Sequence, residues 1–175
     1  MNQWLGEGMP NVKKVPQKPP PIGQEFNTAA DQDNFCIIQL DTVGDPFIRK
    51  YEYTDPNLIA TSKRLTEPWF FSGRTVIGDF WFGSPEMTSV LLDHDLHSIM
   101  QVVKRKYWPR GMPRNDVIRS LGAKRGNHYT AVKQIEHDRP ILVCSYRDLK
   151  PKAIVSSCST SIPSTKIRYY TDRSG

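Results

Sequence analysis

One stretch decides the fold: Gly73-Arg-Thr-Val-Ile-Gly-Asp79-Phe-Trp-Phe-Gly-Ser84-Pro85. Residues 75–77 are β-branched and lie close to glycines on both sides, which predicts a short buried strand. Ser84 and Pro85 predict a helix N-cap and the first helical residue, because proline's fixed φ and missing N–H suit that position. Asp79 is therefore expected at the carboxyl end of a strand, where open α/β sheets usually bind ligands. The alternative for Asp79 is a loop aspartate that only forms a turn.

Working outward from this stretch, the sequence predicts a hairpin, a helix, the strand at 75–78, a second helix and further strands. The hairpin consists of strands at 24–30 and 35–43, joined by a turn at Asp31-Gln-Asp-Asn34. The remaining elements are a helix from Asp55-Pro56 to about Leu65, the central strand 75–78, a helix 85–93 with Met87, Val90 and Leu91 on one face, and strands at 97–103, 130–135, 141–146 and 153–157. This order predicts a mixed α/β sheet.

Composition limits the classes of protein to which the chain can belong. Its 175 residues are enough for one domain, and 38% of them are apolar, so it is not disordered as a whole. No apolar run is long enough to cross a bilayer, and residues 1–25 lack the apolar core of a signal peptide. Cys36, Cys144 and Cys158 are too few and too scattered for a disulfide framework or a zinc site, which suggests a reduced compartment.

The positive charge is concentrated in one segment. The chain carries a net charge of +6, and residues 104–125 contain eight Lys and Arg against one Asp, a net charge of +7 that leaves −1 for the rest. Tyr107 and Trp108 are interleaved with these cations, and basic residues mixed with aromatic ones suit a phosphate backbone with exposed bases. A solvated basic loop is the alternative.

Four segments share their order and spacing with one known family. They are Pro16-Gln-Lys-Pro-Pro-Pro-Ile-Gly23, Arg74-Thr-Val-Ile-Gly-Asp79-Phe-Trp-Phe-Gly-Ser84, Arg110-Gly-Met-Pro113 and the stretch from Leu142 to Thr160. Together they resemble the piggyBac family of cut-and-paste DNA transposases, including the domesticated proteins derived from them. The resemblance extends from about residue 10 to about residue 170.

The resemblance implies an incomplete RNase H-like mixed sheet with an appended, mainly β insertion segment. The expected division is a Pro-rich extended arm at 1–23, a partial transposase core at 24–117, a β-rich insertion at 118–170 and a tail at 171–175. The family's N-terminal DNA-binding region and its C-terminal Cys-rich domain have no counterpart in these residues.

In the family, three acidic residues act with two divalent ions, Mg²⁺ or Mn²⁺, about 3.5–4 Å apart. Asp79 matches the second acidic position. Asp31 lies eight residues after Gly23, the spacing of the first, so Asp31 and Asp79 are the expected catalytic and metal-binding residues, on neighbouring strands. Asp33 and Asp41 are rivals for Asp31: the first falls in the predicted turn and the second within the return strand.

Two departures from the family pattern bear on activity. The family's third catalytic Asp stands in a Gly-Val-Asp context, which Asp172 does not match, so the third carboxylate is missing from these residues. Phe80 stands where the family usually has Asn. Losing one member of a cooperative catalytic set removes most of the rate, and we therefore expect the chain to be inactive alone.

Two functions follow from the resemblance. The first is a transposase-derived fragment of a catalytic domain; the alternative is a non-catalytic DNA-binding or protein-interaction module, and whether the chain is an enzyme is left open. The expected partner is DNA in the nucleus, bound weakly and without sequence preference, with self-association left open and no membrane. The DNA contacts are assigned to Lys104, Arg105, Lys106, Trp108, Arg110 and Arg114.

The aromatic and histidine residues are expected to be structural. The clusters Trp69-Phe-Phe71 and Phe80-Trp-Phe82 are expected to pack in the core, with base stacking by one aromatic beside Asp79 as the alternative. The four histidines are separated by mixed sequence, so surface or core roles are expected for them and not metal binding.

Overall fold

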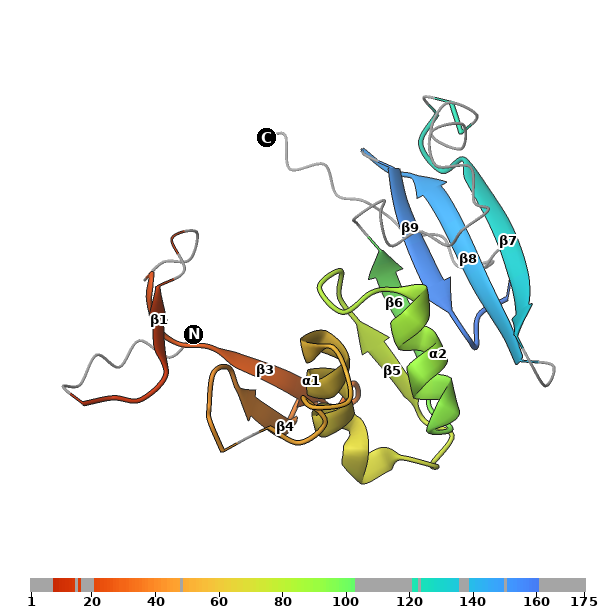
Figure 1. Ribbon diagram of the computed structural model, residues 1–175. Helices are drawn as coiled ribbons and strands as arrows, with labels where there is room; N and C mark the ends of the chain where they lie inside the picture. The colour runs from red at the N-terminus through yellow and green to blue at the C-terminus, as the bar shows by residue number, and fades with distance from the viewer. Residues whose placement is uncertain are drawn as a thin grey trace.

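A computed structural model describes most of the chain and shows three sheets and two α-helices in its described part (Figure 1). The described residues are 8–14, 16, 21–47, 49–102, 121–122, 124–135, 139–149 and 151–160. The elements are β1 (Val12–Lys14), β2 (Ile22–Gln24), β3 (Phe26–Ala30), β4 (Ile37–Thr42), α1 (Asn57–Thr66), the 3₁₀ turn η1 (Glu67–Trp69), β5 (Thr75–Gly78), α2 (Pro85–Asp93), β6 (His97–Val102), β7 (His128–Ile135), β8 (Arg139–Arg147) and β9 (Pro151–Ser156).

The largest sheet has five strands in the order β5-β6-β9-β8-β7. β5 and β6 run parallel and are joined through α2, whereas the other pairs are antiparallel. The prediction of a mixed α/β fold is therefore confirmed. β7, β8 and β9 continue the sheet that begins with β5 and β6, since β9 pairs with β6.

α2 begins as its sequence predicts. The Ser84 Oγ accepts a hydrogen bond from the Met87 N–H at 3.1 Å, and Pro85 occupies the first helical position. Met87 and Leu91 are buried, and they pack with Met100 of β6 and Ile59 of α1. The predicted apolar face of this helix is confirmed, and it attaches α2 to the sheet.

A second core cluster joins β6 to the three later strands. It consists of Val102, Ile141, Val143, Ala153 and Val155, with Leu92 of α2 packed against it. All five cluster residues are at most 4% exposed. Burial of these side chains therefore supports the pairing of β6 with β9.

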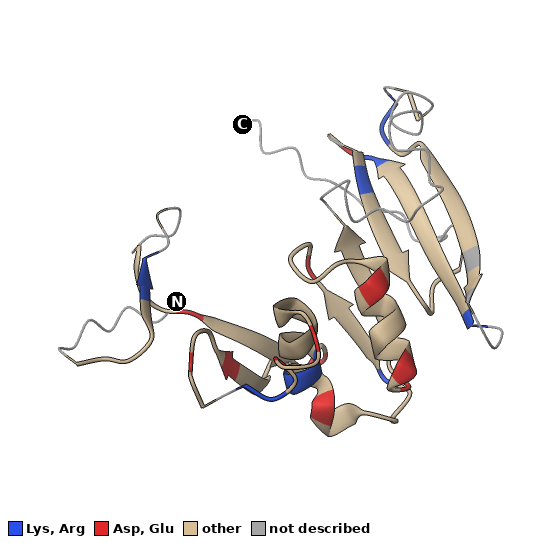
Figure 2. Ribbon diagram, in the orientation of Figure 1, with Lys and Arg blue, Asp and Glu red and all other residues tan. Residues whose placement is uncertain are grey.

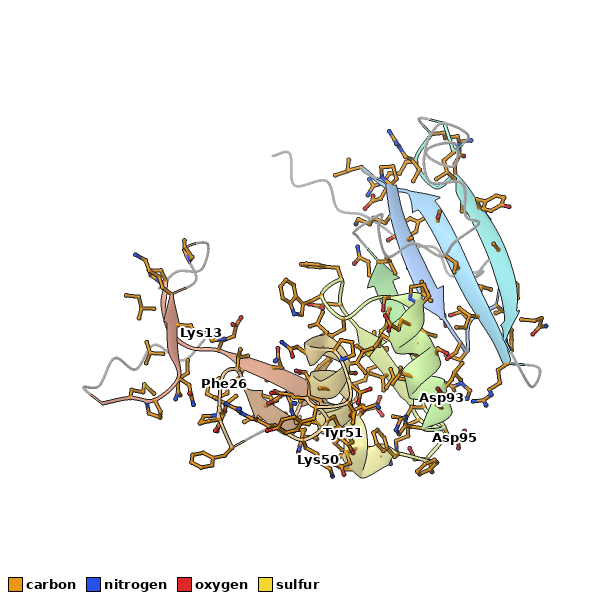
Figure 3. The ribbon with its side chains drawn as sticks, in the orientation of Figure 1. Lys13, Phe26, Lys50, Tyr51, Asp93 and Asp95 are labelled. Carbon is orange, nitrogen blue, oxygen red and sulfur yellow. The ribbon has the colours of Figure 1, made fainter. Side chains whose placement is uncertain are left out.

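β3 and β4 form the predicted hairpin, with Phe26 opposite Thr42 and a register shift near Ala30. α1 is attached to this hairpin by an ion pair between Arg64 and Asp41 at 2.8 Å, in which both side chains are nearly buried. The segment before α1 is attached to the helix as well. Lys63 donates hydrogen bonds to Asp55 at 2.9 Å, and its ammonium lies 5.4 Å from the centre of the Tyr51 ring, near Lys50 (Figure 3).

Two placements differ from the sequence prediction. β5 was expected to be buried and central, but it is an edge strand of the described five-stranded sheet, and Ile77 is 62% exposed. The expectation that Asp31 and Asp79 lie on neighbouring strands is also wrong, because β3 pairs with β4 in a separate two-stranded sheet. β-Branched residues favour an extended backbone, but this preference does not determine which strands become neighbours.

None of the helices in the described ranges is long and apolar enough to cross a membrane.

Candidate functional site

Asp79 follows β5 directly, at the carboxyl end of that strand. Its Oδ1 accepts a hydrogen bond from the Trp81 backbone N–H at 2.8 Å, so the side chain closes a turn. Asp79 is also solvent-exposed. Both sequence interpretations thus describe part of the geometry: Asp79 forms a turn, and it presents a carboxylate at the end of the strand.

The loop after Asp79 is fixed at its far end by Gly83. A Cβ added at Gly83 would lie 1.8 Å from the backbone oxygen of Gln101 in β6, so only glycine fits there without a shift. Ser84 then caps α2, and Phe82 packs against the core cluster that contains Met87. The loop is therefore positioned by β5, β6 and α2 together.

Asp31 also forms a turn, at the end of β3. Its Oδ1 accepts hydrogen bonds from the backbone N–H groups of Asp33 at 2.9 Å and Asn34 at 3.1 Å, which confirms the predicted turn at 31–34. Asp31 is half-buried, whereas Asp33 is exposed within the turn. Asp31 thus ends a strand, as predicted from its spacing to Gly23.

The rival Asp41 has a structural role. It is 3% exposed, and its Oδ2 accepts hydrogen bonds from Arg64 Nη2 at 2.8 Å and Nε at 3.2 Å. A buried carboxylate that is paired with a guanidinium in this way is not available to bind a second cation. Of the three early aspartates, Asp33 is exposed, Asp31 is half-buried and only Asp41 is buried.

Asp31 and Asp79 follow strands of two different sheets, and a two-metal reaction needs carboxylates that converge on one point. Within the described ranges no three His, Cys, Asp or Glu side chains are grouped as a metal site.

The residues predicted to contact DNA, Lys104, Arg105, Lys106, Trp108, Arg110 and Arg114, lie outside the described residues. The structure does place Lys124, Arg125, Arg147 and Lys152 where β7 begins, β8 ends and β9 begins (Figure 2). We call these four residues the basic edge. Sequence analysis missed Arg147 and Lys152 because strand pairing, not sequence proximity, brings them near Arg125.

Asp148 is the acidic partner within the basic edge. Lys152 donates to its Oδ2 at 2.8 Å and Arg125 lies 2.7 Å from its Oδ1. The hydrogen bond from Lys152, and after it the smaller effects of the Leu149 backbone and of Arg125, lower the pKa of Asp148, while Asp148 raises the pKa of Lys152. Four cations against this one carboxylate leave a net charge of +3.

The basic edge and Asp79 lie at the same end of the large sheet. β6 runs parallel to β5 and antiparallel to β9, and β9 runs antiparallel to β8, so β5 and β8 point in the same direction. Asp79 follows the carboxyl end of β5, and Arg147 ends β8. The carboxylate and the cations are therefore at one rim of the sheet.

A cavity of about 500 Å³ lies near the opposite end, where β6 and β8 begin. It is lined by Leu92, Asp93, Asp95, His97, Arg139, Pro140 and Ser157. Asp93 and Asp95 lie at the end of α2 (Figure 3). Neither Asp31 nor Asp79 is among the described residues that line this cavity.

Comparison with known proteins identifies the family. A family model described as Transposase IS4 matches residues 7–174, nearly the whole chain. A solved structure, a cryo-EM structure of the piggyBac transposase synaptic complex with hairpin DNA, matches with a TM-score of 0.66 and 20% sequence identity. The match covers 91% of this chain but only 31% of that one. No curated protein sequence matches the chain. The chain therefore belongs to the Transposase IS4 family, and its α/β fold is shared with part of the piggyBac transposase, consistent with an RNase H-like fold.

Proposed function

We propose that the chain is part of the catalytic domain of a piggyBac-type DNA transposase, with Asp79 and Asp31 at two of its carboxylate positions. The observation that carries this proposal is the placement of Asp79 in a chain of this family. It stands exposed at the carboxyl end of β5, in a loop that is fixed between β5 and the capped start of α2. Such fixed positioning is what a catalytic carboxylate needs.

The cofactor implied by the family is Mg²⁺ or Mn²⁺, which supplies a polarised oxygen nucleophile and stabilises the leaving oxygen. Within the described residues no third carboxylate joins Asp31 or Asp79 in a metal site. We therefore propose that a polypeptide of these 175 residues does not cleave or join DNA by itself. The Asp79 carboxylate is oriented by its hydrogen bond with the Trp81 N–H and is exposed to solvent at the rim of the sheet.

The second candidate function is a non-catalytic DNA-binding module. It is favoured by the basic edge, whose net charge of +3 lies at the same rim as Asp79. Duplex DNA bound there would be held through its phosphates, weakly and without sequence preference. Nuclear localisation and self-association also belong to this proposal, because both rest on the resemblance to the family.

Three proteins test the first candidate: the wild-type chain, Asp79→Ala and the control Asp33→Ala. Fluorescent hairpin and duplex DNA are incubated with Mg²⁺ or Mn²⁺, and products are separated on denaturing gels. We expect no cleavage above background from any of the three. Cleavage that Asp79→Ala abolishes and Asp33→Ala leaves intact would contradict the proposed inactivity and support the carboxylate assignment.

Fluorescence anisotropy at several salt concentrations tests the binding module. The dissociation constant for duplex DNA should be about 10⁻⁴–10⁻⁶ M at physiological salt. Replacing Arg147 and Lys152 by Ala should weaken binding to all sequences alike and flatten the slope of log affinity against log salt by about 2. Lys50→Ala is the control, since Lys50 lies beside α1 and forms an ion pair with Glu67. The absence of binding at low salt would reject the module.

A further inference from the structure

The cavity at the start of β6 and β8 has both charged and apolar walls. The described residues around it carry two carboxylates, an imidazole, a guanidinium and two apolar side chains: Asp93, Asp95, His97, Arg139, Leu92 and Pro140. Its volume of about 500 Å³ lies within the usual range for small-molecule sites, about 300–1,000 Å³. The cavity is large enough for a ligand, and its lining decides which kind.

The charge of the lining is negative. Asp93 and Asp95 are both exposed and are opposed by one cation, Arg139. That cation is already engaged, because its Nη1 donates to the Leu92 carbonyl oxygen at 3.1 Å and lies 3.7 Å from the Asp93 carboxylate. Within the described residues the Asp95 carboxylate forms no hydrogen bond or ion pair. The carbonyl groups at the end of α2 add a partial negative charge, so the lining favours a cation.

His97 contributes an unsatisfied ring nitrogen to the same wall. Its Nδ1 is buried and has no hydrogen-bond partner in the part of the chain that the structure describes. A buried polar atom without a partner costs free energy, which a hydrogen bond would recover. A ligand that carries N–H donors can supply that bond. A metal ion fits less well, since no three His, Cys, Asp or Glu side chains are grouped as a metal site within the described ranges.

The turn that carries Asp95 is fixed by backbone hydrogen bonds. The Phe71 N–H donates to the His94 carbonyl oxygen at 2.8 Å, and the Gly73 N–H donates to the Asp95 carbonyl oxygen at 3.0 Å. Phe71 is held there at a φ of 62°, a strained conformation for a bulky residue. Because the backbone of Asp95 is fixed, little order has to be imposed on it when a ligand binds. The expectation of core packing is wrong for three aromatic residues, which are more than half exposed: Phe71, Phe80 and Trp81.

We propose that this cavity binds an alkylammonium group, the charged end of a lysine side chain or of a polyamine. The carboxylates of Asp93 and Asp95 pair with the ammonium, and Leu92 and Pro140 cover the methylene groups that carry it. The site goes beyond the proposed function, because it lies at the end of the sheet opposite Asp79 and the basic edge.

The test is a titration of the full chain followed by two-dimensional ¹H–¹⁵N NMR. The probe is n-butylammonium chloride, and n-butanol and NaCl at the same concentrations are the controls for the apolar chain and for ionic strength. Butylammonium should cause saturable shifts of the amides of residues 92–97, Arg139 and Ser157, which surround the cavity. Butanol and NaCl should not.

Asp95→Asn keeps the size of the side chain and removes its charge. It should weaken butylammonium binding by about 2- to 5-fold, the usual range for one exposed ion pair. Asp93→Asn should have an effect of similar size, and the double variant should have a larger one. Asp33→Asn removes an exposed carboxylate from the distant hairpin turn and should leave binding unchanged. The same spectra show whether each variant is folded.

Titrations with spermidine and with N-acetyl-lysine methylamide distinguish the two sources of the ammonium group. Tighter binding of spermidine identifies a free polyamine as the ligand, and tighter binding of the lysine derivative identifies a protein side chain. Three results would overturn the site: no saturable shifts around the cavity with butylammonium, the same shifts with butanol, or unchanged affinity in the double variant.

Discussion

Replacing Gly83 by alanine tests whether the loop after Asp79 is positioned by its contact with β6. The added Cβ would lie 1.8 Å from the Gln101 backbone oxygen and 2.7 Å from the carbonyl carbon. Real Cβ contacts essentially never fall below 3.0 Å, so either the loop or β6 must move. β6 is held on both sides by β5 and β9, which leaves the loop as the part that yields.

The expected cost lies at or above the upper end of the range for overpacking, about 3 kcal/mol, because the obstacle is backbone and not a side chain that can rotate. For a chain of this size, such a loss lowers the melting temperature by about 6–12 °C. Thermal unfolding followed by circular dichroism measures this shift.

Gly78→Ala is the matched control, one strand residue before the same loop. There the added Cβ would meet the Met100 side chain at 3.2 Å, and a flexible methionine can adjust. We expect a cost below about 1.5 kcal/mol for Gly78→Ala. The reasoning is refuted if Gly83→Ala is no less stable than Gly78→Ala.

Two further predictions concern the attachment of α1. Arg64→Met should cost about 3–5 kcal/mol because it leaves the Asp41 carboxylate buried without a partner. Asp41→Asn should cost less, since Arg64 keeps its contact with Glu52 at 3.3 Å, and urea unfolding that gives the reverse order would count against this account. The hydrogen bond from Lys63 lowers the pKa of Asp55, so its contribution is present above about pH 4 and is lost as the pH falls through the folded-state pKa. The difference in stability between wild type and Asp55→Asn should therefore shrink below about pH 4, and a difference that is the same at pH 3 and pH 7 would contradict this.

Features that depend on a few neighbouring residues could be predicted from the sequence. The cap at Ser84 and the turn closed by Asp31 each depend on a contact with a residue two or three positions away. The first helical position of Pro85 depends only on its own fixed φ and missing N–H. The apolar face of α2 follows from helical periodicity in the same way. These contacts are set by local chemistry, and the structure confirms them.

The order of the strands could not be predicted in this way. The residues of β5 are those of a strand, but nothing in Thr75–Ile77 specifies that β6 is its neighbour or that its other edge is open among the described residues. β9 lies between β6 and β8 because their side chains share one core. Such pairing depends on contacts between residues far apart in the sequence.

The candidate site was predictable in part. The position of Asp79 at the end of a strand followed from the surrounding sequence, and so did the end-of-strand position of Asp31. The separation of these two aspartates into different sheets did not, nor did the exposure of Phe80 and Trp81. The sequence pattern around an aromatic residue does not show whether its side chain faces the core or the solvent. Only the three-dimensional structure shows that Phe82 packs in the core whereas Phe80 and Trp81 are exposed.

The pairing of β6 with β9 joins two pieces that are each built from nearby residues. On one side are β5, α2 and β6 with Asp79, and on the other are β7, β8 and β9 with the basic edge. This pairing of β6 with β9 consists of four residue pairs, from Ile99 opposite Ser156 to Val102 opposite Ala153. The spacing between the carboxylate and the cations is thus governed by a short ladder of backbone hydrogen bonds, not by the length of chain that separates them in the sequence.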